Sequence, residues 1–141
     1  MKEHCVSLEV AKLLKEKGFN EVCRNYWGGF NEGPLYLCEC NSGKAFDHCW
    51  NTMLEEDYCD YRQTYIAAPK LEEAMDWLRW KHCLHCQVVI KELTDYAAIE
   101  YVYAIADLGF HKHWIRGEYK SYKSYDEACN AAILYCLEHE I

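Results

Sequence analysis

Residues 68–90 read APKLEEAMDWLRWKHCLHCQVVI, and this stretch decides the fold class. Its first part repeats apolar residues at the spacing of a helix face, at Leu71, Ala74, Met75 and Leu78. Acidic residues open this segment and basic residues close it, as the helix dipole favours. We expect Trp77 and Trp80 to widen the buried face. In the second part Cys86, Val88 and Ile90 alternate with other residues, which predicts a strand that follows the helix at once.

Two further helices are predicted at the ends of the chain. Ser7 can cap a helix over residues 8–17, and Gly18 is a typical residue just beyond a helix end. Near the C-terminus, Ser124 and Glu127 have the spacing of a capping box. An apolar stripe follows that box, so we expect a third helix there.

The segments between the helices predict short strands and turns. Apolar alternation indicates strands within residues 34–40, 86–93, 97–107 and 113–122. Gly28-Gly29, Gly33-Pro34 and the LTDY stretch at 93–96 are interpreted as turns. A short helix around residues 47–56 and an irregular path both remain open. The pattern predicts an α+β fold, with one small antiparallel sheet of about three to four strands packed against about three helices.

Length and charge limit the function classes. The chain has 141 residues, which fits a single domain over 1–141. Its net charge of −8 disfavours binding to duplex nucleic acid. One basic group lies near the C-terminus, and we interpret it as a solvated loop and strand. Its members are His111, Lys112, His113, Arg116, Lys120 and Lys123.

The expected compartment is the cytoplasm of a bacterial host cell. No stretch of 18 apolar residues occurs, and the N-terminal residues do not read as a secretion signal. We therefore expect no membrane association. In a reducing compartment the ten cysteines should be mostly free thiols that behave as small buried apolar side chains.

Zinc binding is one open alternative for the cysteines. The candidate ligands are Cys38, Cys40, Cys83 and Cys86. Cys83 and Cys86 have the spacing of a zinc knuckle, whereas Cys38 and Cys40 are spaced as two residues on one strand face. The strand pattern after Cys86 favours a core cysteine over a metal ligand. Thioredoxin-like chemistry is disfavoured, because the pair closes a helix where such thiols should open one.

No catalytic residue or cofactor is assigned from the sequence. No local signature selects a cysteine–histidine pair, and the acidic runs are typical of solvated helix faces. The glycine stretches lack the spacing of a phosphate-binding loop. We expect a protein that is not an enzyme.

Aromatic residues supply the candidate binding site. Tyr101 and Tyr103 share one strand face, and a cationic, aromatic stretch follows them. The six candidates are Tyr101, Tyr103, His111, His113, Trp114 and Arg116. Together they could form an aromatic floor with cationic edges for a planar anion such as a nucleotide. The alternative is that Tyr101 and Tyr103 belong to a core face of the sheet.

Three stretches resemble a group of small uncharacterised proteins of Bacteroidales phages, prophages and mobile elements. They are VSLEVAKLLKEKGFNE at 6–21, YIAAPKLEEAMDWLRWKHCLHCQVVI at 65–90 and YKSYKSYDEACNAAILYCLE at 119–138. The group carries SLE-AK-LKE-GF, AP-A-WLR-KH-IHI and SYEEA motifs. The resemblance places Cys86 where the group has a buried aliphatic residue, and Lys70 where it has a capping Thr or Ser. Residues 38–59 have no counterpart.

Charge, aromatic content and this resemblance predict a non-enzymatic accessory binding protein of a phage or mobile element. It would bind a host or phage protein, and could antagonise a host protein or defence system. The alternatives are sequestration of a nucleotide-like small ligand and a zinc-stabilised interaction module. Self-association into a homo-oligomer stays open.

Overall fold

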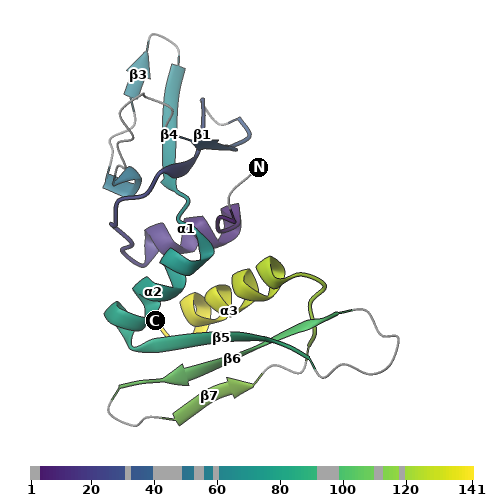
Figure 1. Ribbon diagram of the computed structural model, residues 1–141. Helices are drawn as coiled ribbons and strands as arrows, with labels where there is room; N and C mark the ends of the chain where they lie inside the picture. Colours follow the sequence, from purple (N-terminus) through teal and green to yellow (C-terminus); the bar gives the residue numbers. More distant parts are fainter. Residues whose placement is uncertain are drawn as a thin grey trace. The chain divides into compact units, whose positions relative to one another are not determined.

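The computed structural model describes residues 4–30, 33–39, 49–52, 56–58, 61–91, 99–109, 113–117 and 120–141. The chain comprises two compact units, Met1–Lys70 and Leu71–Ile141 (Figure 1). The α+β class is confirmed, with three helices and antiparallel strands. The strands form two sheets, one in each unit, where the sequence predicted one. That the chain forms a single domain stays a prediction.

The first unit is a four-stranded antiparallel sheet with a helix and a short 3-10 helix. Its elements are α1 (Leu8–Glu16), β1 (Asn25–Phe30), β2 (Tyr36–Glu39), η1 (Trp50–Thr52), β3 (Glu56–Tyr58) and β4 (Tyr61–Ala67). The strand order is β2-β1-β4-β3. Both α1 and η1 contact β4.

Helix α1 forms for the local reasons that the sequence indicates. The Ser7 hydroxyl oxygen accepts a hydrogen bond from the Val10 backbone N–H at 3.3 Å, which satisfies one of the open donors of the first turn. At the other end Gly18 has φ 91°, a left-handed conformation that costs glycine little. The apolar stripe of the helix is buried at Val10, Ala11 and Leu14.

Strand β1 contradicts the predicted turn at Gly28-Gly29. Both glycines lie inside the strand, where Gly28 is opposite Tyr36 on one side and Tyr65 on the other. Strand neighbours on both sides hold the backbone extended, and this tertiary pairing overrides the local preference of glycine. The predicted turn at Gly33 fits the connection from β1 to β2, where its N–H donates to the Phe30 carbonyl oxygen at 3.3 Å.

The second unit is a three-stranded antiparallel sheet covered by two helices. Its elements are α2 (Leu71–His82), β5 (Leu84–Ile90), β6 (Tyr101–Asp107), β7 (His113–Gly117) and α3 (Tyr125–His139). The strand order is β5-β6-β7. Figure 1 shows α2 and α3 on the same face of this sheet, and the two helices also contact each other.

The predicted helix-to-strand junction at the centre of the chain is confirmed. Only Cys83 separates α2 from β5, and its φ of 56° turns the chain back along the helix. Its N–H donates to the Arg79 carbonyl oxygen at 3.1 Å, as in a left-handed helix cap. Cys86 is buried, as expected, whereas Ile90 is half exposed near the end of the strand.

One expectation about α2 is wrong. Trp77 is buried, but Trp80 has 60% of its surface exposed. Trp80 follows Leu71 by nine positions, and at about 100° per residue it points roughly half a turn away from the apolar stripe. Helical periodicity therefore explains why Trp80 does not join the core.

Other local expectations have mixed outcomes. Around residues 47–56 the sequence allows a short helix or an irregular path. The described part of this segment contains a 3-10 helix at Trp50–Thr52, and Glu56 begins β3. The predicted turn at 93–96 lies outside the described residues. Within the part of the chain that the structure describes, no helix is long and apolar enough to cross a membrane.

Candidate functional site

The predicted aromatic floor is divided between two faces of the second sheet. Tyr103 lies on the face that α3 covers and is only 4% exposed. Tyr101 shares that face, and its ring meets the Tyr125 ring of α3 edge-on at 6.0 Å. These two tyrosines therefore belong to the boundary between the sheet and α3, which is the core alternative for this pattern.

Trp114 lies on the opposite face of that sheet. It is paired with Ala106, which alternates with Tyr103 and Ile105 along β6. Its side chain is 60% exposed. Because Trp114 and Tyr103 lie on opposite faces, they cannot line one pocket, and a floor that includes both is wrong.

The remaining candidates of that floor are scattered. His113 is exposed and is paired with Asp107 at the end of β6. Arg116 is paired with Ile105 through the backbone, and an irregularity in the register separates it from Trp114. His111 lies outside the described residues. The irregularity changes which side chains share a face, and residue spacing alone does not reveal it.

The four candidate zinc ligands lie in dissimilar surroundings. Cys38 is partly exposed on β2, and its thiol donates to the Tyr36 carbonyl oxygen at 3.3 Å. Cys83 is exposed and Cys86 is buried, while Cys40 lies outside the described residues. Among the residues with described positions, no group of three or more His, Cys, Asp or Glu side chains could hold a metal ion.

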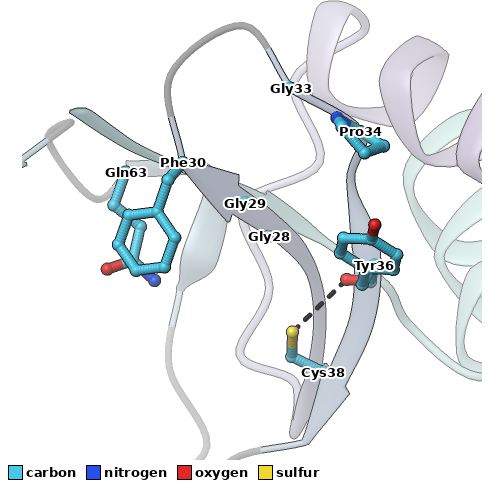
Figure 2. Close-up of a pocket in the computed structure, with 8 residues that line it drawn as sticks. All are labelled: Gly28, Gly29, Phe30, Gly33, Pro34, Tyr36, Cys38 and Gln63. Atoms are coloured by element: carbon cyan, nitrogen blue, oxygen red, sulfur yellow. Dashed lines mark hydrogen bonds between the residues drawn. The ribbon is translucent and has the colours of Figure 1, made fainter. Parts of the chain in front are cut away.

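A surface hollow of about 440 Å³ lies on the first sheet, over β1 and β2 (Figure 2). Such a volume is within the range of ligand pockets. Two aromatic side chains at this hollow are largely exposed, Phe30 at 55% and Tyr36 at 64%. The described lining residues are Gly28, Gly29, Phe30, Gly33, Pro34, Tyr36, Cys38 and Gln63.

The strand register explains why these residues surround a hollow. Gly28 is opposite Tyr36, and Phe30 is opposite Gln63, so all four lie on the same face of the sheet. Gly28 has no side chain, and the Tyr26 ring occupies the space that a Cβ would need, with Cε2 of Tyr26 2.6 Å from that position. A glycine within a strand often marks a place where another group approaches the backbone closely.

A packed aromatic cluster of Tyr26, Trp50 and Tyr65 adjoins Gly28. The Tyr26 and Trp50 rings stack with centroids 4.1 Å apart, and Tyr65 lies 5.6 Å from Trp50. The indole N–H of Trp50 donates to the Cys23 carbonyl oxygen at 2.7 Å. Since Trp50 is buried and hydrogen-bonded, the cluster holds the Tyr26 ring beside Gly28.

The chemistry of the hollow suits an uncharged apolar group. None of its eight described lining residues carries a formal charge, and the polar side-chain groups are a tyrosine hydroxyl, a glutamine amide and a thiol. Sequence reasoning missed this hollow because it interpreted Gly28-Gly29 as a turn. Two glycines flanked by Trp27 and Phe30 are the signal that could have identified a strand that other groups approach closely.

Comparison with known proteins gives no match: no family model, no curated protein and no solved structure matches the chain.

Proposed function

We propose that this protein is a non-enzymatic binding protein that recognises a protein partner through the hollow over β1 and β2. The resemblance to proteins of phages and mobile elements supports an accessory role. In that role the partner is a host or phage protein, and binding antagonises a host function. The proposal rests on the physical character of the hollow and on that resemblance.

The observation that carries the proposal is the exposure of Phe30 and Tyr36 at one concave site. Aromatic side chains bury a large area with few rotatable bonds, so they frequently dominate the binding energy of protein interfaces. Phe30 offers apolar area, whereas Tyr36 adds a hydroxyl that can hydrogen-bond to a partner backbone. The hollow that these two side chains border is largely apolar and can receive a partner side chain.

The absence of charge among the described lining residues favours a protein side chain over a nucleotide. A phosphate group normally requires cationic side chains or a cluster of backbone N–H donors. An apolar side chain requires only an apolar surface from which binding excludes water. A thermal-shift screen distinguishes these ligands, because a nucleotide that binds the folded chain raises its melting temperature. Such a rise in wild type and in Tyr36→Ala alike would support the nucleotide alternative at another site.

The main experiment is affinity capture from a bacterial host lysate with three baits: wild type, Tyr36→Ala and Val22→Ala. Val22 is a matched control, because it is 53% exposed in the same unit but does not line the hollow. We expect wild type and Val22→Ala to capture the same protein. The binding of Tyr36→Ala to this protein should be weaker by at least about tenfold, which corresponds to about 1.4 kcal/mol for an interface residue.

Binding by purified components then decides the proposal. The affinity of the captured protein is measured against the three variants and against Phe30→Ala. If Tyr36→Ala and Phe30→Ala bind as tightly as Val22→Ala, the hollow is not the binding surface and the proposal is wrong.

A further inference from the structure

Two buried cysteines of the second unit lie in contact. The Sγ atoms of Cys86 on β5 and Cys136 on α3 are 3.6 Å apart, although the residues are 50 positions apart in the sequence. Cys136 has no exposed surface, and Cys86 is 6% exposed. The chain therefore brings two thiols together across the boundary between its second sheet and its last helix.

The neighbouring cysteine of α3 has a different environment. Cys129 is also fully buried, and burial raises the pKa of its thiol to about 11. Its thiol is hydrogen-bonded to Tyr125, whereas the thiol of Cys136 is in contact with Cys86. Cys129 therefore serves as a matched control for Cys136, because it lies on the same helix and is equally buried, but its thiol is hydrogen-bonded to Tyr125.

We propose that Cys86 and Cys136 are an oxidisable pair, which closes to a disulfide between β5 and α3 when a hydroperoxide reaches it. The Cys86 sulfur attacks the terminal oxygen of the hydroperoxide and becomes a sulfenic acid, while the O–O bond breaks and the thiol proton of Cys86 passes to the departing alkoxide, which leaves as an alcohol. The Cys136 sulfur then attacks the sulfenic sulfur. The S–S bond forms, and the hydroxide leaves as water with the Cys136 proton. Two thiols are oxidised, and one peroxide is reduced to an alcohol and water.

The geometry assigns the order of these steps. Cys86 reacts first because, of the two residues, only Cys86 retains exposed surface. The contact with Cys86 and burial both raise the pKa of Cys136 well above its usual range, so its thiol stays protonated until the sulfenic acid forms beside it. The separation of 3.6 Å must shorten to about 2.0 Å, which requires a local movement of α3 toward β5 or a rotation of the two side chains.

Oxidation is therefore slow in the folded chain, and it stabilises the fold once it has occurred. The disulfide closes a loop of about 50 residues, which lowers the conformational entropy of the unfolded chain. We expect the melting temperature to rise by more than about 5 °C in the oxidised protein. Thiol–disulfide exchange with a reductant reverses the change.

The test treats the full-length reduced protein with tert-butyl hydroperoxide, unfolds it, alkylates the remaining thiols and maps the peptides by mass spectrometry. We expect the peptide containing Cys86 to be linked to the peptide containing Cys136. The melting temperature of the native protein should rise in parallel, and dithiothreitol should reverse both changes. Alkylation of the exposed Cys83 before unfolding reports that reagents have reached the accessible thiols.

Two variants make the outcome specific. Cys129→Ala should keep both the cross-link and the rise in melting temperature, whereas Cys136→Ala should lose both. Wild-type mapping remains decisive if Cys136→Ala does not fold, because chymotryptic cleavage after Leu84 and Tyr135 separates Cys86 from Cys83 and Cys136 from Cys129. The proposal is overturned if Cys86 and Cys136 stay reduced after Cys83 has been oxidised completely, or if either one is linked to another cysteine.

Discussion

The carbonyl oxygen of Cys83 accepts a hydrogen bond from the backbone N–H of Leu108 at 2.8 Å, which ties the end of α2 to the end of β6. Cys83 adopts φ 56° at this point, the one left-handed non-glycine conformation among the described residues. A side chain in this region costs free energy that glycine avoids. The junction between helix and strand is therefore strained as well as hydrogen-bonded.

We predict that Cys83→Gly stabilises the protein by about 0.5–1 kcal/mol, because relief of the left-handed strain outweighs the greater entropy of glycine in the unfolded chain. Urea unfolding measures the change. Cys83→Ala is the matched control: it removes the thiol but keeps the Cβ, so it should gain nothing. Equal stability of the Gly and Ala variants would show that the φ angle is not the cause.

We predict that Gly28→Ala destabilises the first unit by about 1–3 kcal/mol. A Cβ at this position would lie 2.6 Å from Cε2 of Tyr26, and the stacked Trp50 ring restricts the movement of that tyrosine. A double-mutant cycle measures the coupling by denaturant unfolding. In a Tyr26→Ala background the penalty should fall by about half or more, and an unchanged penalty would exclude the Tyr26 ring as its source.

We predict that Trp50→Phe destabilises the protein by about 1–3 kcal/mol. Phenylalanine cannot donate the 2.7 Å hydrogen bond to the Cys23 carbonyl oxygen, so this buried hydrogen bond would be lost. Trp80→Phe is the comparison, because Trp80 is 60% exposed and should cost less than about 0.5 kcal/mol. Equal costs for the two substitutions, measured by thermal unfolding, would contradict the structural role of Trp50.

We predict that folding stability falls as the pH is lowered from about 7 to about 5.5 through the titration of His82. Burial, and then the charge of Lys81, lowers the pKa of His82 below its ordinary value of 6.5. Its Nε2 atom is buried without a hydrogen-bond partner, and its ring packs edge-on against Trp77 at 4.8 Å. Below pH 6.5 the unfolded chain gains a proton that the folded chain resists. The stabilisation is therefore complete above pH 6.5 and lost as the pH falls.

An NMR titration of the His82 ring should give a midpoint below 6.5, and His82→Phe should reduce the pH dependence of unfolding over this interval. A midpoint at or above 6.5 would contradict the assignment of the buried, neutral imidazole.

The local sequence alone determined the three helices. Ser7 and Ser124 were identified as caps from their positions, and each hydroxyl accepts a backbone hydrogen bond three residues later. The local sequence also predicts the helix-to-strand junction around Cys83. These features depend on contacts within a few residues, so the pattern of residue types is sufficient to specify them.

Tertiary structure decided the sheet pairing and the candidate sites. Alternation showed that Tyr101 and Tyr103 share a face, but only the packing of α3 decided that this face is covered and that Trp114 lies on the other. Gly28 became a strand residue because β2 and β4 pair with it on both sides. Contacts between residues far apart in the chain arise from the packing of whole helices and strands. The spacing of neighbouring residues therefore does not predict these contacts.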